Sequence, residues 1–344
     1  MNRWKFRPEG SNWGDFGPDD QRGRLNLITP DVVRRAVAEV REGLVFCLSL
    51  PLDLPGGRGL NPRRFAPRID FSMRGDDPVI NYPMCCVVPG QTDVVNDDRV
   101  TLSTQYSTQW DSLAHFGAVF DADGDGEAEI VYYNGYRAGE HVRGPFDYLH
   151  GRAPQPGPYG ARALGIENMA TAGVQTRGVM VDVQAHFGTQ WQGIGYDDLM
   201  RIIETDRVDV QPGDILCVRT GFDRVLIGHA GNPPEGLSSK ICAGLDGSDE
   251  RLLQWIDNSG IAAIAADNEG VELLPARKPG KSGTHVPLHE LCLVKLGIHL
   301  GELFYLSELA DWLRQHKRTS FLLTAPPLRL PGAVGSPVTP VATV

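Results

Sequence analysis

The second half of the chain alternates short apolar runs with amphipathic segments. From about residue 179 onward, the runs VMVDV, DILCVR, IAAIAAD and SFLLT are short and apolar, as buried strands are. Between them lie YDDLMRIIE, SDERLLQWIDNSG and SELADWLRQH, whose apolar residues recur at helical spacing. This alternation of strands and helices predicts an α/β core.

One further helix is predicted closer to the N-terminus, over residues 30–42. Thr29 is suited to cap it, Pro30 to occupy its first turn and Gly43 to end it. The strand-like run LVFCLSL follows immediately. The apolar stripe of this predicted helix consists of Val33, Ala36, Val37 and Val40.

Two segments rich in proline and glycine interrupt the regular pattern. Residues 51–67 are also rich in arginine, and they are interpreted as an irregular arm of the kind that contacts a partner subunit, since no independent core precedes them. Residues 325–344 remain apolar and are expected to pack on the core. We therefore expect one domain over residues 1–344, with an N-terminal arm over about 1–70 and a packed C-terminal tail over 325–344.

The charge of the chain argues against two classes of partner. The formal net charge is -10 and the basic residues are scattered, whereas a nucleic acid or an anionic membrane favours a concentrated basic patch. The sequence has no apolar stretch of about 18 residues, and no apolar run follows the first charged residues. We expect a cytoplasmic protein that acts on a small molecule, with neither nucleic acid nor membrane as a partner.

The densest polar cluster spans residues 105–115, between a strand-like stretch and a loop. In an extended segment Gln105, Gln109 and Asp111 point to one face, so three oxygen donors can converge on one ion. His115 follows Asp111 by four residues. The alternative is that the amide and carboxylate groups satisfy loop backbone groups and that His115 is a hydrogen-bonded core histidine. Spacing alone leaves both interpretations open.

A second cluster gathers three imidazoles and two carboxylates within eighteen residues of a chain with nine histidines. Such enrichment is typical of a metal site, although exposure on the surface is an equal alternative. His289 lies in the helical pattern PLHELCLVKLG and Glu302 lies just beyond Gly297–Gly301, so a turn can bring both to one centre. The titratable members are His285, His289, Glu290, His299 and Glu302.

Other motifs are weaker. DADGDGEAE, residues 121–129, has the first acidic positions of a calcium-binding loop, but Tyr132 stands where the bidentate glutamate belongs, so we interpret it as a solvated turn. The sequence contains no G-x-S-x-G nucleophile elbow and no phosphate-binding loop. Serine-hydrolase and nucleotide-binding functions therefore lose support.

Six ordered blocks of sequence resemble the longer members of the cyclase family, which includes kynurenine formamidase, isatin hydrolase and trans-dienelactone hydrolases. The resemblance spans nearly the whole chain, through residues 12–30, 103–116, 212–222, 265–275, 296–310 and 325–342. It implies a swivelling β/β/α fold of α/β class, with a mixed sheet core and flanking helices. It also implies a homodimer or a larger homo-oligomer.

The family motif HxGTHxDxPxH maps onto residues 105–115, and two of its departures concern the metal ligands. Gln105 and Gln109 replace the two metal-binding histidines, while Asp111 and His115 keep their places. The later ligands of the family map onto two residues of the second cluster. The resemblance thus implies a metal site of Asp111, His289 and Glu302, helped by Gln109 and Gln105. Because amide oxygens are weaker ligands than imidazoles, we expect one divalent ion, Zn²⁺ or Mn²⁺.

The implied function is a metal-dependent hydrolase that opens an amide or lactone bond of a small cyclic or aromatic substrate with metal-activated water. His115 is the expected general acid and base. Tyr106 and Trp110 are candidates to pack against a flat ring or to serve the core, and Arg219 is expected to make a structural ion pair. The alternatives are a cyclase or dehydratase at the same ion, and a non-catalytic binding protein that lost its metal histidines.

Overall fold

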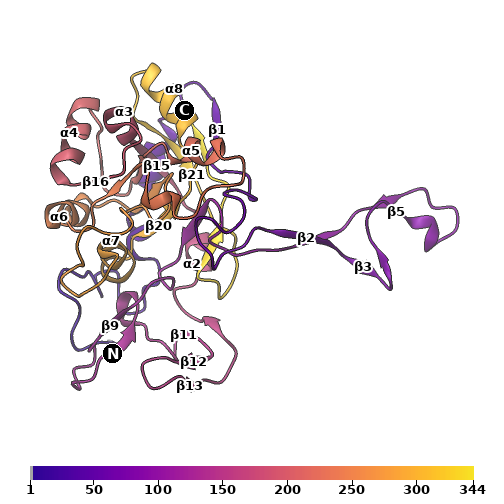
Figure 1. The fold of residues 1–344 in the computed structure, drawn as a ribbon, viewed down its shortest axis with the longest axis horizontal. Helices are drawn as coiled ribbons and strands as arrows, with labels where there is room; N and C mark the ends of the chain where they lie inside the picture. Colours follow the sequence, from indigo (N-terminus) through magenta and orange to yellow (C-terminus); the bar gives the residue numbers. More distant parts are fainter. Residues whose placement is uncertain (1–2) are drawn as a thin grey trace.

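A computed structural model describes residues 3–344. Its centre is a nine-stranded sheet, which is surrounded by helices (Figure 1). The strand order is β1-β23-β21-β15-β17-β19-β20-β8-β22. The strands are β1 (Val45–Cys47), β8 (Gln109–Asp111), β15 (Gln175–Asp182), β17 (Ile215–Arg219), β19 (Ala263–Ala266), β20 (His299–Glu302), β21 (Ser320–Thr324), β22 (Gly335–Pro337) and β23 (Val341–Thr343).

The middle of this sheet is parallel and its two sides are antiparallel. Strands β15, β17, β19 and β20 run parallel to one another. On one side β21, β23 and β1 continue the sheet in antiparallel pairing, and on the other side β8 and β22 do so. The four apolar runs predicted as strands lie in β15, β17, β19 and β21. The mixed sheet of the predicted α/β fold is confirmed.

Helices flank the sheet, and the three amphipathic segments form α4, α6 and α8 as predicted. A π-helical segment, η5 (Glu290–Leu296), continues α7. The α-helices are α1 (Pro30–Val37), α2 (Glu167–Ala172), α3 (Val183–Phe187), α4 (Tyr196–Asp206), α5 (Phe222–Gly228), α6 (Glu250–Ser259), α7 (Pro287–His289) and α8 (Ser307–Gln315).

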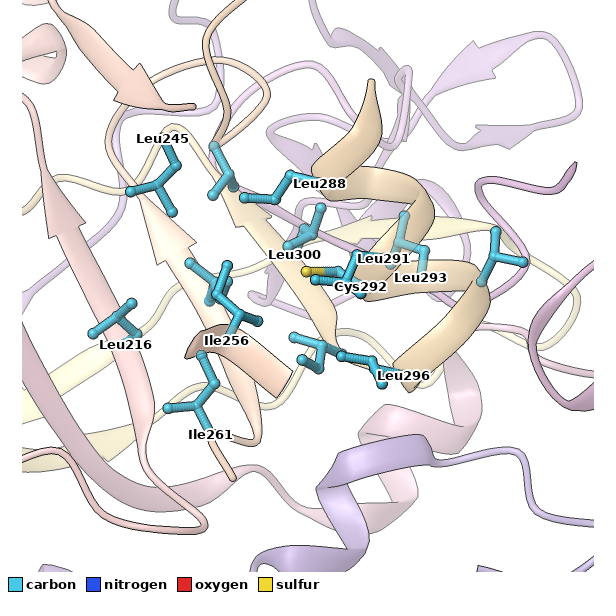
Figure 2. Packing of buried hydrophobic residues seen from close by; sticks show 14 of the residues in the cluster. Leu216, Leu245, Ile256, Ile261, Leu288, Leu291, Cys292, Leu293, Leu296 and Leu300 are labelled. Carbon is cyan, nitrogen blue, oxygen red and sulfur yellow. The ribbon is translucent and has the colours of Figure 1, made fainter. Parts of the chain in front are cut away.

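The sheet carries a hydrophobic core on each face, because side chains alternate along its strands. On one face Leu216 of β17 and Leu300 of β20 belong to a cluster with Ile256 of α6 and Leu293 of η5 (Figure 2). On the other face a second cluster packs strand residues against α8 and includes Met180, Cys217, Leu309, Leu313 and Phe321. Strands β15, β17 and β19 are buried on both sides, which explains their continuous apolar runs.

Helix α1 is shorter than predicted. Thr29 caps it as expected, since its hydroxyl accepts the backbone N–H of Val32. The helix ends at Val37, whose side chain is 52% exposed, so the predicted extent to residue 42 is wrong. The chain leaves the helix because the N–H groups of residues 42 and 43 bond to the carbonyl of Val344, which aligns the following β1 with β23.

The segment that projects from the body lies further along the chain than the expected arm over residues 1–70. Most of that region is attached to the core through buried Trp13, Leu25, Leu48 and Leu50. The projecting part is a ribbon, residues 68–101, which extends away from the sheet, begins as one antiparallel strand pair and ends in two further short pairs (Figure 1). It contains β2 (Arg68–Phe71), β3 (Met73–Arg74), β4 (Asp77–Pro78), β5 (Tyr82–Pro83), β6 (Val94–Val95) and β7 (Asp98–Thr101).

Short strand pairs complete the fold around the sheet. The acidic segment 121–129 connects β9 to β10, and Arg137 contacts Asp123 and Glu129 there. Across residues 3–344, no helix combines the length and apolarity needed to cross a membrane. The paired strands are β9 (Ala118–Phe120) with β10 (Glu129–Val131), β11 (Val142–Arg143) with β14 (Gly160–Ala161), β12 (Phe146–Asp147) with β13 (Ala153–Pro154), and β16 (Gln192–Ile194) with β18 (Ala243–Leu245).

The turn between η5 and β20 depends on Gly297, and we expect Gly297→Ala to destabilise the protein. Gly297 has a φ of +64°, and a Cβ there would lie 2.5 Å from the Cα of Gly23 and 2.8 Å from the Tyr133 ring. The backbone strain and the clash together predict a loss of about 2–4 kcal/mol in the free energy of unfolding. Urea denaturation followed by tryptophan fluorescence measures this loss.

Gly228→Ala is the matched control. Gly228 ends α5, and a Cβ there meets no atom within 4 Å. We expect its unfolding free energy to change by less than about 1 kcal/mol. Equal losses in the two variants would contradict the role assigned to the turn.

Candidate metal centre

Three acidic or imidazole side chains from different elements converge on one point beside the sheet. Asp111 ends β8, His289 ends α7 and Glu302 ends β20, and one ligand atom of each lies within 4.8 Å of the others. All three are buried. This cluster brings together the middle and the last quarter of the chain, as the sequence analysis expected of these three residues.

The pairing of β8 with β20 places the oxygen donors on a common face. Glu302 lies directly opposite Gln109 in this antiparallel pair, and Asp111 lies two residues beyond Gln109 on the same strand. Opposite residues and residues two apart share a face of a sheet. The Gln109 amide donates a hydrogen bond from Nε2 to Oε2 of Glu302 at 2.9 Å, which holds that carboxylate in place.

His289 is oriented by Glu272, a residue that the sequence analysis missed. Oε1 of Glu272 lies 2.6 Å from Nδ1 of His289 and accepts the backbone N–H of His289 at 3.0 Å. The other ring nitrogen, Nε2, lies 3.7 Å from Oε1 of Glu302 and faces the centre. A carboxylate that binds the distal nitrogen of a metal-ligating histidine fixes its orientation. The available signal was the acidic block AADNEGVELLP.

Several buried oxygens of the cluster lack a hydrogen-bond partner among residues 3–344. They are both carboxylate oxygens of Asp111 and Oε1 of Gln109. An uncompensated buried carboxylate is costly, and burial raises the pKa of Asp111 to about 6, with the nearby His115 opposing the rise. A divalent cation satisfies such oxygens. The mixture of carboxylate, imidazole and amide donors therefore fits one ion of the Zn²⁺ or Mn²⁺ type.

The imidazole of His289 shows how strongly negative this pocket is. Burial disfavours the charged ring, but Glu272 and Glu302 outweigh burial and raise the pKa of His289 to about 10. A proton and a cation compete for Nε2 of this ring. Cation binding therefore releases a proton, as is usual for imidazole ligands.

Gln105 lies beside His115 and does not offer a free oxygen to the centre, contrary to the expectation that it assists as a ligand. Its Nε2 lies 3.1 Å from Nδ1 of His115, and its Oε1 accepts the hydroxyl of Thr104 at 2.8 Å. The physical reason is local: β8 begins at Gln109, and the residues before it form a turn. The strand alternation that aligns Gln109 with Asp111 therefore does not reach Gln105.

His115 lies next to the cluster and is partly open to solvent. Its Nε2 lies 3.8 Å from Oδ1 of Asp111, and its side chain is 25% exposed. Because the amide of Gln105 donates to Nδ1, the neutral ring carries its proton on Nε2, toward Asp111. The ring is therefore placed to exchange protons with a group bound at the centre.

Of the two aromatic candidates, only Tyr106 borders a cavity near the centre. Trp110 is fully buried on the opposite face of β8, where its indole packs edge-on against Phe304 and donates to the carbonyl of Ala325. Its expected role in substrate binding is therefore wrong, because alternation along the strand turns it away from Asp111. The hydroxyl of Tyr106 donates to the carbonyl of Gly57.

The remaining members of the second cluster lie outside the ligand set. His285 is exposed, and Glu290 binds Ser282 and Lys295. His299 is buried, and its Nδ1 lies 2.9 Å from the backbone carbonyl of Asp111, so it supports the strand that carries this ligand. Burial lowers the pKa of His299 to about 4, which keeps the ring neutral at pH 7.

A narrow cavity adjoins the centre and contains two charged residues that sequence reasoning did not identify. Arg64, Tyr106, Glu269 and Leu303 line it. The guanidinium of Arg64 lies 3.9 Å from Oε2 of Glu302. Burial and the charge of Glu302 raise the pKa of Glu269 to about 7. Arg64 lies in none of the sequence blocks that resemble the family, whereas Glu269 belongs to AADNEGVELLP, the block that also contains Glu272. Only the tertiary structure places these two residues beside the centre.

The fold and the converging side chains define an α/β protein with a candidate site for one divalent cation at the edge of the parallel sheet. A family profile described as "Putative cyclase" matches residues 48–273, which is more than half of the chain. The chain belongs to the cyclase family. This match confirms the resemblance inferred from the sequence blocks.

Solved structures share the fold over most of the chain. A crystal structure described as a novel cyclase has 30% sequence identity, covers 97% of this chain and 97% of its own, and has a TM-score of 0.70. Isatin hydrolase A from Ralstonia solanacearum has 14% identity, covers 91% of this chain and 97% of its own, and has a TM-score of 0.52. Isatin hydrolase A from Labrenzia aggregata, bound to benzyl benzoate, has 14% identity, coverages of 90% and 95%, and a TM-score of 0.50. No curated protein matches the chain.

The contact between Glu272 and His289 predicts that Glu272→Gln weakens cation binding. The substitution keeps the size of the side chain but removes the charge that makes the imidazole a stronger ligand. We expect the affinity for Zn²⁺ or Mn²⁺ to fall by roughly 10–100-fold. Competition with a chromophoric chelator measures the affinity directly.

Glu290→Gln provides a matched control. Glu290 is the residue next to His289, but its carboxylate binds Ser282 and Lys295 instead of the imidazole. We expect this variant to bind the cation as tightly as the unchanged protein. A comparable loss in both variants would show that general charge, and not the contact with His289, governs the affinity.

Proposed function

We propose that this protein is a metal-dependent hydrolase that opens an amide or lactone bond of a small cyclic or aromatic substrate. The observation that carries the proposal is the convergence of Asp111, His289 and Glu302, together with oxygens of Asp111 and Gln109 that accept no hydrogen bond from the described residues 3–344. Buried polar atoms without partners are rare away from functional sites. Family membership supports the same conclusion.

The protein's own residues supply the ligands and their alignment. Asp111, His289 and Glu302 would hold the cation, with Oε1 of Gln109 as a fourth donor. When bound, a divalent cation lowers the pKa of water and polarises a carbonyl group. Glu272 keeps Nε2 of His289 directed at the centre, and the Nε2 amide of Gln109 positions Glu302.

His115 would carry the protons of the reaction. After it has taken up the proton of the attacking water, the ring is an imidazolium that can pass the Nε2 proton to the leaving nitrogen or oxygen as a general acid. To accept the proton of the attacking water at Nε2, the ring needs its other tautomer. Gln105 supports that tautomer when its amide turns over, because Oε1 then accepts from Nδ1. Gln105 is thus a positioning residue for both proton transfers.

The choice of a cyclic or aromatic substrate rests on two observations. Tyr106 places an aromatic ring in the wall of the cavity beside the centre. Two proteins that share the fold are named isatin hydrolases, which makes a cyclic amide a suitable first substrate to test. A cyclase or dehydratase reaction at the same ion is separated from hydrolysis by identifying the product by mass spectrometry.

Gln105 and Gln109, in place of two imidazoles, favour a second candidate, a non-catalytic binding protein. Neutral amides bind a cation more weakly than imidazoles do. However, Gln105 makes specific contacts with His115, and Gln109 holds Glu302 in place. These contacts give both glutamines defined roles in an active centre.

Asp111→Asn is expected to remove the bound cation and hydrolysis together. The substitution replaces a fully buried anionic ligand with a neutral amide of equal size. Protein purified without added metal should contain about one equivalent of Zn or Mn, and the variant should contain almost none. Elemental analysis and a panel of arylformamides, cyclic amides and lactones check both outcomes.

His115→Gln separates chemistry from metal binding in the same experiment. This variant should retain the cation and lose roughly 10²–10⁴-fold in kcat, because general acid–base catalysis contributes about that much. Metal-free wild-type protein that keeps its fold and hydrolyses nothing would instead favour the binding protein.

For the expected homo-oligomer, we propose that the ribbon of residues 68–101 binds a second copy of this chain. Its apolar side chains Ile69, Phe71 and Val100 are 66%, 41% and 53% exposed, and an isolated two-stranded ribbon is marginally stable in water. The same chain carries a hollow on its body lined by apolar Val142 and Phe146. A second copy therefore offers an apolar surface for the ribbon.

The double substitution Ile69→Thr and Val100→Thr tests this contact. The two residues are opposite each other in β2 and β7, and threonine retains a preference for strands. We expect the wild-type chain to be a dimer or larger by light scattering and the double variant to be smaller. Val37→Thr, at an exposed position on α1, is the control and should leave the mass unchanged. A monomeric wild-type chain would rule out the contact.

A further inference from the structure

Arg64 is held beside the metal centre by a loop that is closely packed on the body. Two glycines allow this approach: a Cβ on Gly56 would lie 1.8 Å from the carbonyl oxygen of Gly231, and one on Gly59 would lie 2.4 Å from that of Pro233. Tyr106 adds a hydrogen bond to the carbonyl of Gly57 at 3.0 Å. The loop that carries Arg64 is therefore placed by specific contacts.

Only one edge of the Arg64 guanidinium is used by the protein. Nη1 donates to the backbone carbonyl of Gln105 at 2.7 Å and lies 3.9 Å from Oε2 of Glu302. In the part of the chain that the structure describes, Nε and Nη2 of Arg64 donate no hydrogen bond. The pair formed by Nε and Nη2 is the edge that matches the two oxygens of a carboxylate.

The structural arginines of this fold are different. Arg177 donates to both oxygens of Asp214 through Nε and Nη2, at 3.0 and 2.7 Å. Arg219 is almost fully buried and binds Asp182 and Ser307, as expected for a structural ion pair. In both arginines, the guanidinium binds side chains of other elements and so joins parts of the fold. Arg64 instead borders the cavity and keeps its Nε edge free.

The charged surroundings of Arg64 do not cancel its charge. Glu269, on the same cavity wall, accepts the hydroxyl of Ser238 at 2.9 Å and lies beyond 4.0 Å of the Arg64 nitrogens. Glu302 is the one carboxylate within that distance among the described residues, and it belongs to the metal ligand set. With a divalent cation bound, the charge of Glu302 is already compensated, which leaves the guanidinium for an anionic ligand.

We propose that Arg64 is a substrate-binding residue that pairs with a carboxylate, so that the substrate is an amide or lactone that also carries a carboxylate group. This inference rests on the proposed hydrolase function and narrows its substrate class. The carboxylate would bind at the Nε–Nη2 edge, and the bond to be opened would lie at the adjacent metal centre. Tyr106 and Leu303 line the same narrow cavity as Arg64.

The test compares two arylformamides that differ by one carboxylate, N-formylanthranilate and formanilide. In Arg64→Gln we expect the KM for the carboxylate substrate to rise roughly 10–100-fold, because a charge-assisted bidentate contact is lost. The KM for formanilide should stay unchanged. Arg63→Gln is the matched control, since the neighbouring Arg63 is exposed, donates to Asn61 and does not line the cavity.

Direct binding gives a readout that does not depend on turnover. Isothermal titration of the metal-loaded protein with benzoate and with benzamide should show weaker benzoate binding in Arg64→Gln by a similar factor, and unchanged benzamide binding. Arg64→Lys should restore part of the benzoate affinity, because lysine keeps the charge but lacks the planar fork. It also serves as the second variant if the glutamine variant folds poorly.

Failure of this inference is distinct from failure of the proposed function. Equal losses for the anionic and neutral ligands, or an equal loss in Arg63→Gln, would overturn the role of Arg64 even if hydrolysis is confirmed. Loss of the bound metal in Arg64→Gln would also overturn it, since Arg64 would then act through Glu302. Absence of hydrolysis in every wild-type assay would reject the hydrolase, while the benzoate titration would still decide for or against Arg64.

Discussion

The candidate centre of this protein depends on two carboxylates that are buried close to each other. Asp111 and Glu302 lie at the ends of two adjacent strands, away from water, where carboxylates are tolerated only when something compensates them. His289, held by Glu272, supplies one part of that compensation. In the function proposed above, a divalent cation would supply the larger part, and the same ion would polarise a substrate.

The antiparallel addition of β8 to a parallel sheet makes this placement possible. Parallel strands bring their carboxyl ends to one edge, and β20 delivers Glu302 there after the turn at Gly297. Strand β8 comes from a distant part of the sequence and pairs in the opposite direction, so its Asp111 enters the same space. On the opposite face, the same strand contributes Trp110 to the core. One short strand therefore anchors the site and supplies its ligand.

One loop of the N-terminal third reaches this centre, and the segment that follows it extends away. The glycine-rich loop before Phe65 packs tightly on the body and brings Arg64 to the cavity, while the ribbon that follows projects into solvent with apolar side chains exposed. Neither the loop nor the ribbon has a hydrophobic core of its own. Contacts with the body of the protein hold the loop in place. The guanidinium of Arg64 then lies 3.9 Å from Oε2 of Glu302, beside the proposed ligand set.

The parts of the site that local sequence predicted well are those with regular periodicity. The alternation of β8 aligned Gln109 with Asp111, and the helix, turn and strand order brought His289 to Glu302. The prediction was wrong for Gln105, where the chain turns before the strand begins, and for the end of α1, where hydrogen bonds to the last residue of the chain replace further helix. When contacts with residues distant in the sequence set the end of a strand or helix, the neighbouring residues do not predict that end.

By itself the sequence indicated the α/β class and the strands and helices of the second half of the chain, because apolar periodicity is a local property. Its resemblance to the cyclase family pointed to Asp111, His289 and Glu302 as a candidate centre. Only the tertiary structure decided that Glu272 orients His289, that Gln105 holds His115, and that Arg64 borders the cavity. These contacts join residues that are separated along the chain by loops without regular spacing. Their partners are selected by the packing of the whole fold, which no short stretch of sequence encodes.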